Sequence, residues 1–414
     1  MELSLSPRRR TGPAALALAT VLAVLLPAAA PAATPNDLRD VLVVSNNWAG
    51  TADIIDVRTS RRLKRLNVVP DKAQRIAQIE AEPAAKLFFD AIRQLVGDGH
   101  NQYVDDGFAS KDGRLIFFSR PSFADVVAID VAMNRIRWRV PVEGNRADHM
   151  ALSPDGRRLL VSASTASKVH VIDTARGRIV GSFASGYAPH ENNFSRDGRT
   201  IFHANLGTPY TDTDDFSEDE GKGVRYFEIV DARSLRVRTR IEIGKELARY
   251  GLNVNGAVRP MAIAPDEKTM FFQLSFVHGF VEWDLVAMRP KRIMVLPYSE
   301  ASRRLPRTAY TQDSAHHGLT FDNAGRKLCV AGTMSNYAAI VRRSTLTVQG
   351  TVAVGDKPYW STTSRDGRYC YVSVSGNDRV SVIDYRTARE VRRIPVGDHP
   401  QRMRIGYVRA DAVD

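Results

Sequence analysis

A unit of about 42 residues recurs along this chain and limits the folds open to it. Its clearest copy, Ser153–Phe183, consists of short runs rich in β-branched residues separated by turns, the first turn being Ser153-Pro154-Asp155-Gly156. The turn glycine, or Glu267 in its place, returns after 43, 42, 69, 58 and 42 residues: Gly113, Gly156, Gly198, Glu267, Gly325 and Gly367. A period of this length with several strands per unit predicts the blades of a β-propeller.

The number of blades follows from the strand that leads into each turn. Seven such strands can be counted: Tyr103–Ser110, His149–Ser153, Glu191–Ser195, Met261–Ala264, His317–Phe321, Trp360–Ser364 and Arg402–Tyr407. The last has no strands after it, whereas three N-terminal runs match the second, third and fourth strands of a blade: Asp40–Asn46, Ala52–Val57 and Arg62–Val68. We therefore predict an all-β fold, a seven-bladed β-propeller closed by N-terminal strands that pair with a C-terminal strand.

The wording of the repeat resembles a known family. A G-x-x-P before the first strand, turns of the type Ser153–Gly156, Ser195–Gly198 and Ser364–Gly367, and a V-x-V-I-D phrase are similar to the YVTN-repeat family of seven-bladed propellers. The resemblance covers nearly all of the chain after its N-terminal region, and the long insertions and several first-strand residues depart from the pattern. It implies the fold but no single activity, because similar propellers range from binding modules to lactonase-like enzymes.

The first 33 residues have the order of a secretory signal peptide. Arg8-Arg9-Arg10 precede an apolar run from Pro13 to Leu26, and Ala30-Pro31-Ala32 offers a cleavage site. We predict a signal peptide over residues 1–33, one propeller domain over 34–414, and a secreted, periplasmic or cell-envelope location. The apolar run is short for a membrane span, so no stable span is expected, with an N-terminal anchor as the alternative.

The charge distribution limits the classes of partner. The net charge is +12, but Lys and Arg are scattered rather than clustered, so we expect no specific nucleic-acid partner, and we expect a monomer.

The two cysteines, Cys329 and Cys370, fall on second strands of consecutive blades. Face-to-face sheets lie about 10 Å apart, and a disulfide needs Cα atoms within about 7 Å. We therefore expect two buried thiols.

A repeated aspartate ends the third strand of most blades. An aspartate there accepts hydrogen bonds from the amides of the following turn, so we interpret the set as scaffold. Its members are Asp56, Asp130, Asp173, Asp231, Asp284 and Asp384.

The start of each first strand faces the central channel at one mouth of a propeller. Small or apolar residues would suffice there, yet several blades present imidazole or carboxylate groups. The seven positions read Asp105-Asp106, Asp148-His149, His190-Glu191, Arg259, His316-His317, Tyr359-Trp360 and Gln401-Arg402. Four insertions emerge on this same face: Asp71–Gly99, Gly207–Gly223, Lys245–Ala257 and Tyr298–Ser314. Function concentrates on loops held by a rigid scaffold, so we interpret this face as the functional one.

Two of the insertions carry patterns of their own. Apolar residues at helical spacing in Ala73–Ala81 and Ala84–Val96, broken by Pro83, predict a short helical insertion near residues 71–99. It would be either a lid over the site or a plain rim element. Carboxylates between Asp212 and Glu220 could bind Ca²⁺, although their spacing differs from that of an EF-hand loop.

The channel-mouth residues leave three interpretations open. First, His149, His190 and His317 could hold a divalent metal ion, with Glu191 or Asp105 as the carboxylate ligand. Second, the same residues could perform acid–base catalysis, with Arg259 polarising a substrate oxygen and Tyr359 forming part of an apolar wall. Third, they could be satisfied polar residues around ordered water. The other histidines, His170, His203, His278 and His399, we expect to be structural or solvent-facing.

The leading functional hypothesis is that this site binds and transforms a small polar molecule by hydrolysis or elimination, with metal assistance as one variant. The alternative is a non-catalytic cell-envelope module that binds a protein or glycan through the loops of the same face. No G-x-S-x-G, H-E-x-x-H or glycine-rich phosphate loop occurs in the chain, and nothing in it names the substrate.

Overall fold

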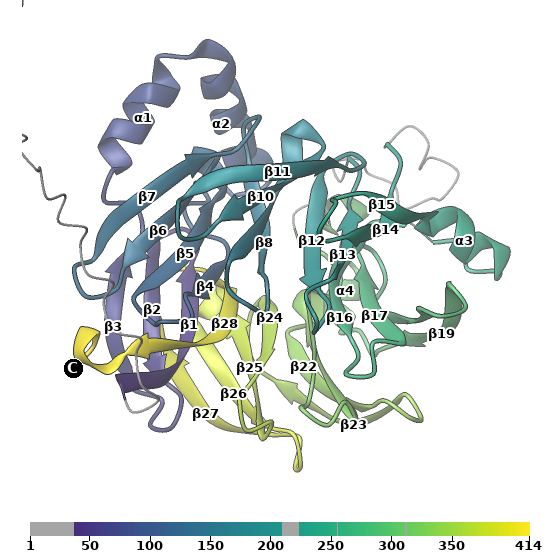
Figure 1. The fold of residues 1–414 in the computed structure, drawn as a ribbon. Coiled ribbons are helices and arrows are strands. Elements are labelled where there is room, and N and C mark those ends of the chain that lie inside the picture. The colour runs from purple at the N-terminus through teal and green to yellow at the C-terminus, as the bar shows by residue number, and fades with distance from the viewer. Residues whose placement is uncertain (1–36, 209–222, 255, 311–312) are drawn as a thin grey trace, which may run out of the picture. The chain divides into compact units, whose positions relative to one another are not determined.

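The computed structural model describes residues 37–208, 223–254, 256–310 and 313–414. Over these residues the chain forms seven four-stranded antiparallel sheets arranged as the blades of a propeller (Figure 1). The predicted seven-bladed β-propeller is therefore confirmed. The predicted signal peptide and the acidic segment between residues 212 and 220 lie outside the described residues.

The blades follow one another along the chain, each beginning with its innermost strand. The first combines β28 (Pro400–Arg409) with β1 (Leu38–Asn46), β2 (Thr51–Asp56) and β3 (Arg62–Asn67). The second blade contains β4 (Gly107–Ala109), β5 (Leu115–Arg120), β6 (Asp125–Asp130) and β7 (Arg135–Pro141). The third contains β8 (Ala147–Leu152), β9 (Arg158–Ala163), β10 (Lys168–Asp173) and β11 (Arg178–Ala184). The fourth contains β12 (Pro189–Phe194), β13 (Thr200–Asn205), β14 (Tyr226–Asp231) and β15 (Val237–Glu242). The fifth blade contains β16 (Val258–Ile263), β17 (Thr269–Leu274), β18 (Gly279–Asp284) and β19 (Arg289–Val295). The sixth contains β20 (Gly318–Phe321), β21 (Lys327–Gly332), β22 (Tyr337–Arg342) and β23 (Thr347–Ala353). The seventh contains β24 (Pro358–Thr363), β25 (Tyr369–Val374), β26 (Arg379–Asp384) and β27 (Arg389–Pro395).

The ring closes as the sequence predicts. Strand β28 pairs antiparallel with β1, from Leu38 opposite Arg409 to Asn46 opposite Pro400 (Figure 1). This pairing joins the two ends of the domain in one sheet, so neither strand is left with an open edge on that side.

The repeated turns set the length of each strand. In the turn after β8, the Ser153 hydroxyl donates to Asp155 at 2.6 Å and accepts from the Arg158 amide at 2.9 Å. Gly156 has φ +74°, a left-handed conformation that suits glycine. Glu267 occupies the equivalent position with φ +51°, so its predicted role as a substitute for the turn glycine is confirmed.

The core lies between blades rather than in one central mass. Between the second and third blades, Phe117 and Val126 pack with Leu159 and Val161, all of them buried. The channel side is different, because charged side chains from different blades are buried together there. Arg402 of the first blade lies 2.9 Å from Glu191 of the fourth and 3.7 Å from Asp106, which precedes β4 of the second. The fold therefore separates an apolar inter-blade core from a polar axis.

Helices lie mainly in the insertions. The predicted helical insertion is confirmed as α1 (Lys72–Glu80) and α2 (Pro83–Leu95), which lie side by side at one rim (Figure 1). Pro83 begins α2 rather than interrupting a helix, since a first-turn proline gives up no helical hydrogen bond. Helix α3 (Ile243–Arg249) begins just before the third insertion and runs into it, and α4 (Glu300–Arg303) lies within the fourth. Among the described residues, no helix combines the length and apolar character needed to cross a membrane.

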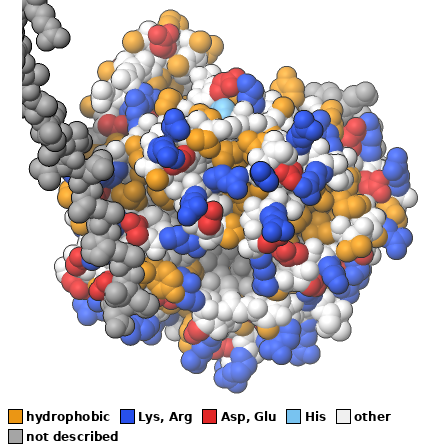
Figure 2. Space-filling view, in the orientation of Figure 1, with side chains coloured by type: hydrophobic (Ala, Val, Ile, Leu, Met, Phe, Trp, Pro, Cys, Tyr) orange, Lys and Arg blue, Asp and Glu red, His pale blue; other side chains and the backbone are white. Residues whose placement is uncertain are grey.

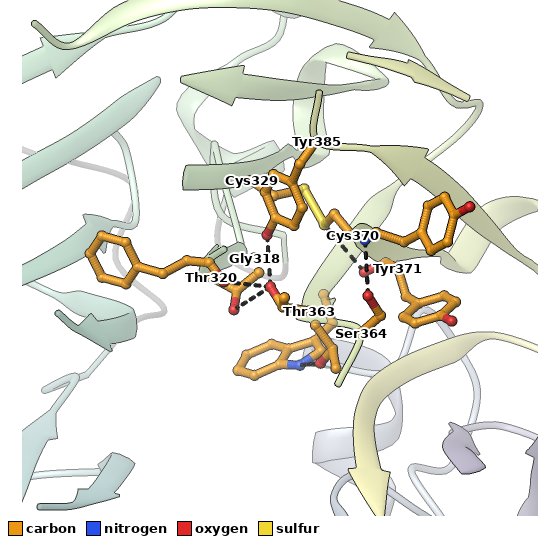
Figure 3. The surroundings of a disulfide bond; sticks show 12 residues. Gly318, Thr320, Cys329, Thr363, Ser364, Cys370, Tyr371 and Tyr385 are labelled. Atoms are coloured by element: carbon orange, nitrogen blue, oxygen red, sulfur yellow. Dashed lines mark hydrogen bonds between the residues drawn. A yellow bond between two sulfur atoms is a disulfide. The ribbon is translucent and has the colours of Figure 1, made fainter. Parts of the chain in front are cut away.

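The two cysteines form a disulfide, so the prediction of two thiols was wrong. Cys329 on β21 and Cys370 on β25 are both fully buried, with Cα atoms 6.4 Å apart (Figure 3). The prediction used the spacing of sheets stacked face to face, whereas propeller blades converge on the axis like wedges. Second strands lie near the axis, so here the neighbouring backbones come within disulfide range. Beside the bond, the hydroxyls of Thr363 and Tyr385 are 2.7 Å apart.

The repeated aspartates are scaffold, as predicted. Each accepts a hydrogen bond from at least one amide of the turn that follows its strand. The donors are the amides of Thr59, Met133, Arg176, Ser234, Ala287 and Thr387, in chain order. Figure 2 shows basic side chains spread over the face drawn there, with acidic and apolar groups between them, in agreement with the scattered charge of the sequence.

Candidate functional site

The first strands bring the predicted residues together at one mouth of the channel. His149 lies on β8, His190 and Glu191 on β12, Arg259 on β16 and Tyr359 on β24. Asp105 precedes β4 and His317 precedes β20 by one residue. All except Tyr359, which is partly exposed, are buried.

A cavity of about 450 Å³ opens above these residues. Of the seven predicted site residues, five line it: Asp105, His149, His190, Arg259 and Tyr359. Glu191 and His317 do not line it and are almost completely buried. The candidate site therefore has two parts, a set of residues that face the cavity and a second set beneath them.

The three predicted histidines are neighbours, but they are not equivalent. The ring centroids of His149 and His190 are 3.8 Å apart, whereas His317 lies 6.3 Å from the first and 6.2 Å from the second. His317 instead stacks on Tyr359 at 3.9 Å. A compact group of metal-type donors is formed by His149 and His190 with Asp148, whose candidate ligand atoms all lie within 4.8 Å of one another.

Arg402, from the closing strand β28, supplies the central positive charge. Its Nη2 donates to Glu191 Oε2 at 2.9 Å and contacts both ring nitrogens of His149. Its guanidinium group also lies over the ring of Trp360 at 4.0 Å. Asp106 is held by a neighbouring arginine, Arg404, through two hydrogen bonds of 2.8 and 2.7 Å. Two of the buried carboxylates thus have a direct cationic partner.

Burial dominates the protonation of the site. It raises the pKa of Asp105 to about 7, against the opposing effect of Arg402. Burial likewise raises the pKa of Glu191, again opposed by Arg402. Burial, followed by nearby arginines, holds the pKa values of His149, His190 and His317 well below the usual range of histidine. The three imidazoles are therefore neutral at physiological pH, the form that can accept a proton or bind a metal.

Several buried atoms of the site have no hydrogen-bond partner within the described part of the chain. They are Oδ2 of Asp105, Nδ1 of His190 and both ring nitrogens of His317. A buried polar atom without a partner costs free energy, and such atoms concentrate where a ligand supplies what the protein lacks. Such atoms also occur elsewhere among the described residues, for example Nδ1 of His170 and Oγ of Ser361, so they support a ligand site here because Asp105 and His190 also line the cavity.

The first insertion forms an apolar wall of the cavity. Residues along one side of α2 line it, and these are Phe88, Ala91, Ile92 and Leu95. Lys357 joins two insertions at the rim, through ion pairs of 2.8 Å to Asp98 and 2.9 Å to Asp313. A helix of the first insertion thus covers part of the cavity.

Sequence reasoning gave no role to several residues of the site. Asp148 and Arg402 were recognised only as channel-mouth positions, and their register with the histidines was the signal that could have singled them out. His399 was expected to be structural or solvent-facing, yet it is buried, lines the cavity and stacks at 3.7 Å on Trp48. Trp48 stacks on His100 at 3.9 Å on its other side. These three rings lie outside the strands and come from segments far apart in the sequence, so no local sequence pattern shows that they stack on one another.

Comparison with known proteins supports the fold. The sequence model of the methylamine dehydrogenase heavy chain family matches residues 155–327. A solved structure titled hydrazine synthase, from Kuenenia stuttgartiensis, has a TM-score of 0.55 and 18% sequence identity, over 75% of this chain and 96% of that chain. A search of curated proteins found no match. The chain is thus a β-propeller similar to these proteins, and at this identity the structural likeness extends to the fold alone.

Proposed function

We propose that the channel-mouth cavity binds a small polar molecule and transforms it by hydrolysis or elimination. The observation that supports this most directly is that two residues lining the cavity, Asp105 and His190, each have a buried polar atom without a hydrogen-bond partner among the described residues. A volume of about 450 Å³ lies within the range of small-molecule sites, roughly 300–1,000 Å³.

The lining gives the ligand two ends. Phe88 and Leu95 of α2 present an apolar surface, which suits a hydrocarbon portion. Arg259, Asp105 and His190 lie on the polar side of the same cavity. The substrate class that fits both ends is a small molecule with an apolar body and an oxygen-bearing head group.

The polar side also contains the groups that such a reaction requires. Hydrolysis or elimination needs a group that accepts a proton and a cation near the developing negative charge. The neutral imidazole of His190 meets the first need, and the guanidinium of Arg259 meets the second. Tyr359 closes the wall beside them.

The test is a panel of esters, lactones and eliminable polar compounds, with products measured by mass spectrometry. We expect His190→Ala to abolish turnover of any compound that the wild-type protein converts, and Phe88→Ala to raise KM more than it lowers kcat. Asp173→Asn, at a scaffold turn, serves as the control and should behave like wild type. A protein that converts nothing, and whose capture of an envelope protein or glycan depends on the loops but not on His190, would instead be the non-catalytic module.

Export and the family remain part of the same proposal. We infer a secreted or periplasmic protein of the YVTN-repeat type whose residues 1–33 are removed. The disulfide between Cys329 and Cys370 supports this, because disulfides form and persist in oxidising compartments. Mass spectrometry of the protein from its native host should find a mature N-terminus near residue 33.

A further inference from the structure

We propose that the cavity floor is a binding site for one divalent transition-metal ion, with Asp105, Asp148, His149 and His190 as its ligands. The proposal shares the cavity of the proposed function but does not depend on any reaction there. With the ion bound, His190 is a metal ligand, and it is free to accept a proton only in the metal-free protein. It also replaces the three-histidine set predicted from the sequence, because Asp105 and Asp148 take the place of His317.

The spacing of the donor atoms is that of a coordination shell. Nε2 of His149 lies 3.5 Å from Oδ2 of Asp105 and 3.4 Å from Oδ1 of Asp148. Ligands at metal distances of 2.0–2.2 Å in a tetrahedral site are about 3.4 Å apart. Asp148, His149 and His190 can each place one donor atom within 4.8 Å of the others. Small side-chain adjustments would bring all four donors onto one ion.

Two of the four donor residues have an atom without a hydrogen-bond partner among the described residues. Oδ2 of Asp105 is buried with no such partner there, and Arg402 Nε, 3.8 Å away, is beyond hydrogen-bonding distance. Within the same part of the chain, Nδ1 of His190 is also buried without a partner. Both residues are more than nine-tenths buried and line the cavity. A cation at this point would satisfy both atoms.

The surrounding residues hold the ligands as outer contacts commonly do at metal sites. Ser164 donates a hydrogen bond of 3.0 Å to Oδ2 of Asp148, which leaves Oδ1 directed to His149. Nδ1 of His149 lies 3.3 Å from Oε2 of Glu191 and is also in contact with Nη2 of Arg402. Once that guanidinium moves away, an Nδ1 proton can be shared with Glu191 while the Nε2 lone pair stays available. A carboxylate behind a ligating histidine fixes its tautomer and ring orientation.

Arg402 makes the site conditional. Its Nη2 lies 3.0 Å from Nε2 of His149 and also contacts Nδ1, so metal binding requires the guanidinium to turn away from both ring nitrogens. Glu191 already accepts from Nη2, and Asp106 lies 3.7 Å from Nη1, so the group has anionic partners to turn to. The metal and Arg402 therefore compete for His149. A stronger contact between Arg402 and His149 should lower the affinity of the site for the metal.

The donor set indicates which metals fit. Two imidazoles and two carboxylates suit Zn²⁺, Mn²⁺ or Fe²⁺ better than soft Cu⁺, and oxygen-only Mg²⁺ or Ca²⁺ would be poorly served. The cavity above the donors leaves room for water or substrate at a further coordination position, which would make the ion a Lewis acid for the proposed reaction.

The test uses the mature chain, treated with a chelator and then dialysed against Zn²⁺, Mn²⁺ or Co²⁺. We expect one metal ion per chain by elemental analysis, and visible Co²⁺ absorption typical of a four- or five-coordinate site. Asp148→Ala and His190→Ala should lower the metal content at least tenfold. His317→Ala should retain it, and His170→Gln, a buried histidine on β10, is the matched control and should also retain it.

Each outcome decides between the possibilities. Wild-type protein that holds less than about one-tenth of an ion per chain, or Asp148→Ala protein that binds as wild type does, overturns the site. Loss of metal in His317→Ala but not in Asp148→Ala restores the three-histidine arrangement and also overturns it. Where an alanine variant does not fold by circular dichroism, Asp148→Asn and His190→Gln replace it. If elemental analysis finds no bound metal and the protein still binds a ligand or turns it over, the metal site fails while the proposed function stands.

Discussion

Two rings of polar residues repeat around this propeller, and they differ in how their hydrogen bonds are met. At the end of the third strand in six of the seven blades, an aspartate such as Asp173 or Asp384 accepts hydrogen bonds from the amides of its own turn. At the channel mouth, Asp105 and His190 lie buried with atoms that have no partner within the described chain. Residue type does not separate scaffold from site here. Asp105 and His190 differ from the turn aspartates because they combine an unpartnered buried atom, among the described residues, with a place in the cavity wall.

The largest loss of unfolding free energy should follow from removing Arg402, the cation at the centre of the channel-mouth carboxylates. Arg402→Met would leave Glu191 buried without its 2.9 Å partner and remove positive charge beside Asp105 and Asp106. Removing one partner of a buried ion pair costs about 3–5 kcal/mol of unfolding free energy. Urea denaturation measures the loss. Arg365→Met, which removes an exposed arginine paired with Asp40, is the control and should cost no more than about 1 kcal/mol. Equal losses in the two variants would show that the channel charges are no more dependent on pairing than surface ones.

A buried histidine outside the channel offers the next test. His203 on β13 is hydrogen-bonded to Ser185 and Asn192, and burial lowers its pKa to about 3. In the unfolded chain the same group takes up a proton as the pH falls through about 6.5. The unfolded state then binds more protons, so the stability contribution present above pH 6.5 is lost as the pH falls toward 3.

Between pH 7.5 and pH 5 this loss amounts to about 2 kcal/mol for one histidine. We expect His203→Gln to reduce the pH dependence of the unfolding free energy by that amount, measured by urea denaturation at the two pH values. Burial raises the pKa of nearby Glu228, an effect of opposite sign that both proteins share. An unchanged pH dependence in the variant would mean that His203 is not held neutral in the fold.

The scaffold ring should show a smaller, uniform cost. Asp384→Ala removes the acceptor of the Arg386 and Thr387 amides, at 2.8 and 2.9 Å. The loss of these turn hydrogen bonds should lower the unfolding free energy by about 1 kcal/mol. Asp384→Asn keeps one acceptor oxygen and should lose less. If both variants keep wild-type stability, the repeated aspartates do not stabilise the turns that follow them.

The sequence was sufficient for the scaffold because its signals are local. Blade number could be predicted because the turn glycines and the six repeated aspartates shape turns only a few residues long. Ring closure could be predicted because one strand, Arg402–Tyr407, had no following strands and needed the N-terminal strands as its partner. Even Glu267, a residue that disfavours the left-handed conformation, was placed correctly by the period alone. Register also placed seven candidate residues at one channel mouth.

The failures involve distances between blades. The disulfide was missed because the approach of Cys329 and Cys370 depends on how strongly the blades converge, which no period encodes. His317 was grouped with His149 and His190 on register, yet its ring turns to stack on Tyr359. Asp148 and Arg402 became visible only when side-chain directions were known. These are tertiary properties, and they decide which members of a register form a site.

The smallest effect should also have the opposite sign. Asp105→Asn removes a carboxylate whose Oδ2 is buried and has no hydrogen-bond partner in the described part of the chain, and an amide in its place can donate to Nε2 of His149. We expect the unfolding free energy of the metal-free protein to stay unchanged or to rise by up to about 1 kcal/mol, because groups kept for function are often unfavourable for stability. Thermal melting in the presence of a chelator measures this. A loss as large as that of Asp384→Ala would place Asp105 with the scaffold aspartates. A gain in unfolding free energy would show that aspartate stabilises the fold at a scaffold turn and destabilises it at the channel mouth, as the hydrogen bonds at the two places predict.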